Sequence, residues 1–140
     1  MKVTISAPAD KVWSYAADPA RLPRWWPAVD RVDRPDPESY TRWVMSPRGK
    51  AVPMAFSLSS LRAGESVEWI QVLAGTPFAK AIGSSTESIS VAEADAGSEV
   101  TISINRRLKG TARLGSFFVR RGQKRELASA AAQLKEALDA

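Results

Sequence analysis

The sequence predicts an α+β fold in which a curved, seven-stranded antiparallel sheet wraps around a long C-terminal helix. Seven segments alternate apolar and polar residues as half-buried strands do. Two short helical segments follow the first strand, and residues 125–140 carry apolar residues at helical spacing. Because one helix covers only part of such a sheet, we expect the sheet to curve around it and to leave a cavity between them.

The N-terminal segment contains one strand and two short helices. Residues 2–6 (KVTIS) alternate as a strand does, and residues 8–18 (PADKVWSYAAD) place their apolar side chains on one helical stripe. Pro8 suits the first turn of that helix. Residues 18–26 (DPARLPRWW) predict a second short helix, which Pro27 ends.

Six further strands occupy the middle of the chain. The turns between them contain Gly or Pro, which supply the backbone angles that tight turns need. Regular alternation indicates an antiparallel sheet with one face in water and one face in the core. The six segments are 28–35, 39–46, 52–61, 66–74, 84–93 and 98–110.

The chain closes with an amphipathic helix over residues 125–140 (RELASAAAQLKEALDA). Leu127, Ala131, Leu134 and Leu138 follow one another at spacings of four, three and four, which places them on one face. This face is expected to pack on the sheet.

The earliest start for this helix is Thr111. Gly115 and Gly122 would then weaken its first half by about 1 kcal/mol each relative to Ala. We expect this weakened half to act as the gate of the cavity.

The amino-acid composition excludes several kinds of functional site. The 140 residues suit one domain over 1–140 and include neither cysteine nor histidine, which excludes disulfides, the common zinc ligands and the usual general base. We therefore expect no metal and no cofactor. The opening residues lack the apolar core of a signal peptide, and no apolar run is long enough to span a membrane, so we expect a cytoplasmic protein.

Residues 5–32 (ISAPADKVWSYAADPARLPRWWPAVDRV) combine a strand with an Ala-Pro-x-x-x-Val-Trp segment and an Asp-Pro segment that leads to tryptophan. Together with residues 97–104 (GSEVTISI) and the closing helix, they resemble the START-like or SRPBCC superfamily, also called the Bet v 1-like or helix-grip fold. The group in question is that of polyketide cyclase/dehydrase and lipid transport proteins. This resemblance spans essentially the whole chain. It implies a hydrophobic ligand bound between sheet and helix, although the superfamily includes binders, transporters, cyclases and co-chaperone-like modules.

The adjacent Trp25 and Trp26 follow the second short helix. The resemblance implies that the two short helices close one end of the sheet, so we expect one tryptophan to cap the core and the other to line the cavity rim. The alternative is packing alone, with Trp26 buried and Trp25 half exposed.

Strand alternation assigns a set of side chains to the inner face of the sheet, where they would bind the ligand. Methionine and aromatic residues suit an adaptable apolar cavity. The alternative is an ordinary dry core. The predicted lining is Trp26, Trp43, Met45, Met54, Phe56, Leu58, Trp69, Gln71, Glu87, Ile89, Ile102 and Ile104, with Leu114, Phe117 and Phe118 from the helix side.

Glu87 shares the apolar face of its strand with Ile89. If Val91 pairs with Val100 in the last hairpin, Glu87 lies opposite Ile104 and diagonal to Arg106, within reach of its side chain. A carboxylate in an apolar cavity must pair or take up a proton. A Glu87–Arg106 pair would anchor or polarise a ligand; a structural ion pair near the rim is the alternative. Gln71 is a second polar candidate.

Three functions fit these observations. The first is the binding, and in one version the carriage, of a small hydrophobic or amphipathic molecule. The second is a polyketide cyclase or dehydratase that uses Glu87, with Arg106, Gln71 and Tyr40 as its only other polar tools and no triad, phosphate loop or metal motif to help. The third is a protein-interaction module with a filled core.

Residues 106–125 carry a net charge of +8, against +5 for the whole chain. They are expected to form the solvated face of the helix or to contact an anionic membrane surface, where each Lys or Arg contributes about 1 kcal/mol and Phe117 and Phe118 could insert. Nucleic acid is a weaker expectation, because the sequence contains no known binding module. A protein partner is the remaining alternative.

Overall fold

The computed structural model describes residues 1–139, so Ala140, the last residue of the predicted helix, lies outside the described part. One antiparallel sheet of seven strands has the order β1-β7-β6-β5-β4-β3-β2, which confirms the predicted fold class. The strands are β1 (Lys2–Ile5), β2 (Val29–Asp36), β3 (Ser39–Met45), β4 (Ala51–Arg62), β5 (Ser66–Gln71), β6 (Ile82–Ala94) and β7 (Gly97–Leu108).

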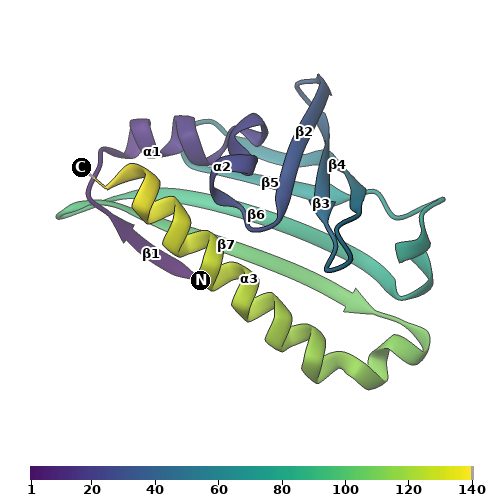
Figure 1. Cartoon of the computed structure of the whole chain (residues 1–140). Helices are drawn as coiled ribbons and strands as arrows, with labels where there is room; N and C mark the ends of the chain where they lie inside the picture. Colours follow the sequence, from purple (N-terminus) through teal and green to yellow (C-terminus); the bar gives the residue numbers. More distant parts are fainter. Residues whose placement is uncertain (140) are drawn as a thin grey trace.

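The long helix lies along one side of this sheet, and the two short helices sit beside its C-terminal half (Figure 1). No helix among residues 1–139 is both long and apolar enough to cross a membrane. The helical segments are α1 (Ala9–Ala16), η1 (Pro19–Arg21), α2 (Leu22–Trp25), η2 (Pro77–Lys80), η3 (Gly110–Gly115) and α3 (Ser116–Leu138), where η marks a 3₁₀ turn.

The two halves of α3 differ in how they pack. Its fully buried side chains are Ala130, Ala131, Leu134 and Leu138, all in the second half and at helical spacing. The side chain of Lys135 donates to the Thr4 carbonyl at 2.9 Å, and the Asp139 carboxylate accepts from the Ser6 backbone at 3.0 Å, which ties this half to β1. None of the side chains from Ser116 to Ser129 is fully buried.

The interior stripe of α3 changes character toward its N-terminus. Counting back from Leu127 in helical steps of four, three and four gives Gln123, Arg120 and Ser116. The stripe that begins with leucine and alanine therefore continues over the loosely packed half with the half-buried Gln123 and Ser116 and the exposed Arg120, and the half-buried Val119 lies beside it.

Both tryptophans of the Trp-Trp pair are buried, so the alternative with Trp25 half exposed is wrong. Their rings meet edge to face with centroids 5.5 Å apart. The backbone turns from helical at Trp25 to extended at Trp26. This change sends one ring into the core and the other towards α3, where Trp26 Nε1 donates to Glu126 Oε2 at 2.8 Å.

The predicted inward position of Trp43 and Met45 is wrong. On β3 it is Tyr40 and Arg42 that are buried, and Trp43 and Met45 lie on the opposite face by strand alternation. Trp43 instead donates to Asp33 near the surface. The interior takes the other side of the strand because Arg42 finds a buried carboxylate there.

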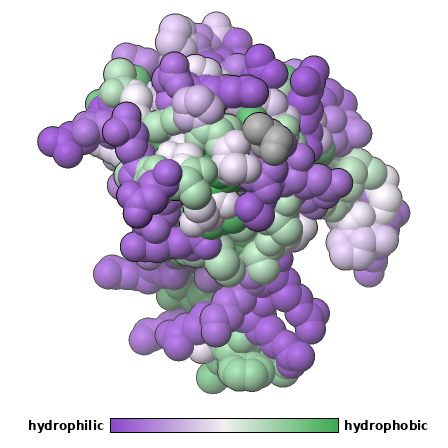
Figure 2. All heavy atoms as spheres, turned by 90° about the vertical axis from the view of Figure 1, so that its left-hand side faces the viewer, coloured by the Kyte–Doolittle hydropathy of each residue, from purple (hydrophilic) through white to green (hydrophobic). Residues whose placement is uncertain are grey.

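Leu114, Phe117 and Phe118 do not line the interior, contrary to the prediction. They are 89 %, 67 % and 74 % exposed. Figure 2 shows hydrophobic surface at the lowest point of the molecule, the height at which α3 begins in Figure 1, with hydrophilic side chains above it. The cause is the helix phase: with the half-buried Ser116 and Gln123 on the side that faces the sheet, Phe118 points away from it.

Candidate functional site

The hairpin of β6 and β7 has the predicted register. Val91 pairs with Val100, Ile89 with Ile102 and Glu87 with Ile104. Glu87 therefore lies on the inner face of the sheet, in the same row as buried apolar residues, and is itself buried. A charged group in this position needs a partner.

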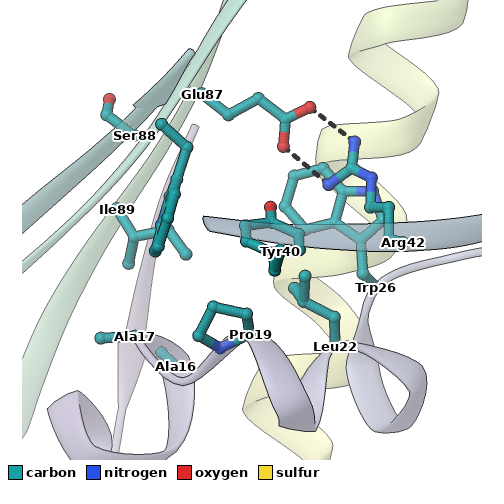
Figure 3. A pocket seen from close by; sticks show the side chains of 11 residues that line it. Ala16, Ala17, Pro19, Leu22, Trp26, Tyr40, Arg42, Glu87, Ser88 and Ile89 are labelled. Carbon is teal, nitrogen blue, oxygen red and sulfur yellow. Dashed lines mark hydrogen bonds and ion pairs between the residues drawn. The ribbon is translucent and has the colours of Figure 1, made fainter. Parts of the chain in front are cut away.

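That partner is Arg42, which the sequence reasoning missed. Arg42 Nη1 donates to Glu87 Oε1 at 2.8 Å, and Nη2 donates to Oε2 at 2.6 Å. The two side chains are only 2 % and 8 % exposed. Figure 3 shows this two-pronged contact above the short helices. Parallel paired hydrogen bonds of this kind are the strong form of the arginine–carboxylate contact.

Aromatic rings hold the Arg42 guanidinium in place. Its carbon lies 4.5 Å from the centre of the Phe56 ring and 5.1 Å from that of Trp26. Burial by itself favours the neutral form, but attraction and hydrogen bonding to Glu87 raise the pKa of Arg42 further above its usual range. Arg42 is therefore a fixed cation.

Tyr40 completes this layer. Its ring stacks on Phe56 with centroids 5.0 Å apart and meets Trp69 edge to face at 4.8 Å. Burial raises the pKa of the Tyr40 phenol well above its usual range, and the nearby Glu87 adds to the effect against the opposing influence of Arg42. The phenol is thus protonated at neutral pH.

The predicted Glu87–Arg106 contact exists in a weaker form. Arg106 Nη2 lies 3.9 Å from Glu87 Oε2, and Arg106 Nε donates to the Ser85 hydroxyl at 3.3 Å. One buried carboxylate therefore faces two guanidinium groups, of which Arg42 has the shorter contacts.

The interior around this pair is nearly full. A cavity of about 20 Å³ lies between the short helices and the sheet, beside Tyr40, Arg42 and Glu87 (Figure 3). This is room for about one water molecule and too little for a lipid-sized guest. The roomy cavity expected from the sequence is not found at this place. Of the predicted lining, Trp26, Trp69, Glu87 and Ile89 border it.

The remaining predicted residues divide by depth. Phe56, Gln71 and Ile102 are buried in the core, whereas Met54, Leu58 and Ile104 are partly buried against it. Gln71 is 3 % exposed, and neither its Nε2 nor its Oε1 has a hydrogen-bond partner among the described residues. A buried amide without partners costs free energy, about 1–3 kcal/mol for each lost bond. Gln71 is therefore an uncompensated polar group of the core, and it does not border the cavity beside Glu87.

Two open grooves follow the loosely packed half of α3. The first, called the arginine groove, has a volume of about 370 Å³ and lies between α3 and the end of β7. The second, called the helix groove, has a volume of about 500 Å³ and follows α3 toward Leu127. The arginine groove is lined by Arg106, Arg107, Leu108, Arg113, Ser116, Val119, Arg120 and Gln123, and the helix groove by Phe117, Arg120, Arg121, Gln123, Lys124 and Leu127.

The two grooves offer both apolar contacts and hydrogen-bond donors to a ligand. Within residues 1–139 no group of three or more acidic side chains is placed to hold a metal ion. The grooves present apolar carbon at Phe117 and Leu127 and hydrogen-bond donors at the arginines and Gln123. A signal in the sequence could have located them, since the phase of the apolar stripe, continued toward the N-terminus, reaches Gln123, Arg120 and Ser116.

Comparisons of structure show the same fold in other proteins. The di-domain ARO/CYC protein StfQ from the steffimycin biosynthetic pathway superposes with a TM-score of 0.76 at 14% identity, over 97% of this chain and 48% of that one. The di-domain ARO/CYC protein BexL from the BE-7585A pathway gives 0.80 at 21% identity, over 97% and 44%. The chain thus spans about half the length of each. A START superfamily protein from Mycobacterium smegmatis gives 0.72 at 11% identity, over 99% and 94%.

Comparison of sequence adds the family. A search of curated proteins finds no match. The family described as polyketide cyclase / dehydrase and lipid transport matches residues 1–139, nearly the full length of the chain. The solved structures share the fold that is expected for this family. The chain therefore belongs to the polyketide cyclase / dehydrase and lipid transport family.

Proposed function

We propose that this protein binds a small hydrophobic or amphipathic molecule between the inner face of the sheet and the first half of α3. One observation carries the proposal. Over residues 116–129 the helix has no fully buried side chain, yet it borders grooves of about 370 and 500 Å³. A guest in these grooves would cover Phe117 and Leu127 and give the half-helix the packing that it lacks.

Entry and release would use the same half of the helix. The second half is tied to β1 through Lys135 and Asp139, whereas the first half carries Gly122 at an exposed helical position. A glycine inside a helix weakens it by about 1 kcal/mol relative to alanine. Such a segment opens more readily than the packed core, which suits a gate and would permit carriage of the guest.

The ion pair favours binding over acid–base catalysis. A cyclase or dehydratase that used Glu87 would need a free carboxylate, but both Glu87 oxygens accept hydrogen bonds from Arg42. Tyr40 is held in its neutral form. These polar groups are better suited to orient a guest than to move its protons. The nearly filled cavity beside them is also what a protein-interaction module would have, so guest binding needs a direct test.

Native mass spectrometry of freshly purified protein is the first test. Guest binding predicts an additional mass of a lipid-like molecule, or saturable binding of an apolar fluorescent dye by the emptied protein. Absence of both would contradict the proposal.

A pair of variants locates the guest. Gln123→Trp fills the place where the two grooves meet and should weaken dye binding at least tenfold. Arg125→Trp adds the same ring to an exposed position of α3 that lines neither groove and should leave dye binding unchanged. Equal affinities of the two variants would exclude the grooves as the site.

A membrane contact is a second candidate, favoured by the exposed tip. Phe117 and Phe118 form an edge-to-face pair with centroids 5.6 Å apart, next to the exposed Leu114. Arg113, Arg120 and Arg121 surround them in sequence, which suits transient contact with an anionic membrane. The protein should sediment together with vesicles that contain phosphatidylglycerol but not with neutral vesicles. The Phe117→Ser/Phe118→Ser variant should not sediment with either kind of vesicle. Equal binding to both kinds of vesicle would exclude the idea.

A further inference from the structure

The apolar stripe of α3 becomes polar where the helix leaves the packed core, and it carries an exposed arginine, Arg120. Leu138, Leu134 and Leu127 lead along one face to Gln123, Arg120 and Ser116. A solvated helix face places its charges on the outside. Here Arg120 and Gln123 line both grooves, of which the arginine groove lies between α3 and the end of β7. The polar stripe therefore belongs to the proposed binding site.

The arginine groove concentrates positive charge without local compensation. Arg106 at the end of β7 borders this groove from the inner face of the sheet, and Arg113 and Arg120 border it from the helical side. Arg107 also lines the groove, although alternation turns its side chain to the other face of β7. None of the groove's lining residues is acidic, and residues 106–125 contain no Asp or Glu at all. The positive charges that line the groove repel one another, which lowers the stability of the empty groove, and an anion would relieve this repulsion.

Arg106 shows the imbalance most directly. Its side chain is only 16 % exposed, but the carboxylate nearest to it, Glu87, is already held at 2.6 and 2.8 Å by Arg42. The remaining contact of Arg106 is 3.9 Å long, and its one hydrogen bond goes to a neutral hydroxyl, that of Ser85. The positive charge of this largely buried guanidinium is only weakly neutralised, so its N–H groups could donate to an additional oxyanion.

Two further donors belong to residues that line the same groove. Gln123 Nε2 is shielded from solvent and has no hydrogen-bond partner among the described residues. Ser116, the first residue of α3, contributes a hydroxyl, and the first turn of α3 contains no acidic side chain to neutralise the positive end of the helix dipole. Ser116, Gln123 and the arginines together match the several acceptor oxygens of one carboxylate or phosphate group.

We infer that the arginine groove holds the anionic head of an amphipathic guest, a carboxylate or a phosphate monoester, while the apolar part of the guest lies along the helix groove. This inference rests on the proposed function and names the class of molecule: an amphipathic anion rather than a neutral lipid. Arg120 and Gln123, which line both grooves, stand where the head joins the apolar part.

The test compares guests that differ only in the head. Dodecyl phosphate and dodecanoate are titrated by calorimetry below their micelle concentrations, and dodecanol below its solubility limit. The wild-type protein should bind the two anions at least tenfold more tightly than the alcohol. Arg113→Gln/Arg120→Gln should remove most of this preference, because binding of the two anions should fall by a larger factor than binding of dodecanol. The matched control, Arg24→Gln/Arg125→Gln, removes two exposed arginines outside both grooves and should keep the preference.

The outcomes separate this inference from the proposed function. Equal binding of the anions and the alcohol would overturn the anion site while guest binding stands. Binding of inorganic phosphate that Arg113→Gln/Arg120→Gln abolishes, without binding of any dodecyl compound, would support the anion site and contradict guest binding. If no probe binds, both are wrong. Binding to anionic vesicles alone, without binding of monomeric dodecyl phosphate, would overturn the groove as a head-group site and favour the membrane surface.

Discussion

Arg42 and Glu87 join two strands that are not neighbours in the sheet. Arg42 is on β3 and Glu87 on β6, with β4 and β5 between them, yet their side chains meet at 2.6 and 2.8 Å. In a flat sheet three strand spacings would separate the two backbones by about 14 Å. The contact therefore depends on the curvature of the sheet and crosses its inner face.

Removal of one partner of this pair should be costly. Glu87→Gln leaves the Arg42 cation buried without compensation, and we expect the free energy of unfolding to fall by about 3–5 kcal/mol. Urea unfolding of the variant measures this. The surface pair Lys2–Glu99, at 3.6 Å and largely exposed, is the matched control, and Glu99→Gln should cost less than about 1 kcal/mol.

The double variant Arg42→Met/Glu87→Leu tests the same pair without a stranded charge. Because an apolar replacement of a buried pair is often neutral in stability, the double variant should be more stable than Glu87→Gln. A double variant as unstable as the sum of both single ones would show that the two residues act independently.

The hydrogen bond from the Trp26 indole to Glu126, which links the short helices to α3, should contribute to the free energy of unfolding. Trp26→Phe removes the hydrogen bond to Glu126 and part of a buried ring, and we expect a loss of about 1.5–3 kcal/mol in the free energy of unfolding. Trp43→Phe removes an equivalent hydrogen bond, 2.9 Å long, to the exposed Asp33 and should cost less than about 1 kcal/mol. Similar losses from both would contradict the difference in burial.

Tyr40 should make the stability fall at alkaline pH. Its pKa is raised in the folded state, chiefly by burial, so the folded protein keeps the phenolic proton that the unfolded chain releases near pH 10. The contribution of Tyr40 is complete below pH 10 and is lost above it, by roughly 1.4 kcal/mol per pH unit.

Tyr40→Phe provides the comparison. Unfolding free energies of both proteins are measured by urea denaturation from pH 8 to pH 11.5. The difference between wild type and variant should be constant up to about pH 10 and then shift in favour of the variant. A constant difference over the whole range would mean that Tyr40 ionises equally well in the folded protein.

Gly122 should govern the opening of the first half of α3. A Cβ at this position would meet nothing within 4 Å, and its backbone has no left-handed angle, so Gly122→Ala should stabilise the helix by about 0.5–1 kcal/mol. Backbone hydrogen exchange over residues 116–126 should slow by about two- to fivefold, and bound guest should leave more slowly. Slower exchange with an unchanged release rate would show that this half of the helix is not the gate.

Much of the fold follows from local pattern. Alternation placed seven strands, and the spacing of Leu127, Leu134 and Leu138 placed the packed half of the helix. The register of the β6–β7 hairpin also followed, because a shift by one residue would turn Val91 and Val100 into water.

The side chains that form the candidate site were harder to predict from local pattern. Residues 39–46 alternate in two acceptable phases, one with Trp43 and Met45 inward and the other with Tyr40 and Arg42 inward. Hydrophobicity prefers the first, but the structure has the second. Phe117 and Phe118 were assigned inward as aromatic residues suited to an apolar cavity, although the continued stripe of α3 leads to Gln123 and Ser116 instead.

The sequence by itself determined the order of the elements, the faces of most strands and the end of the helix that packs, because each depends on residues close together in the chain. Only the tertiary structure decided that an arginine belongs inside. Burial of Arg42 costs free energy unless a carboxylate lies within hydrogen-bond distance. That carboxylate belongs to Glu87, which is 45 residues away in the chain and comes close to Arg42 only because the sheet is curved.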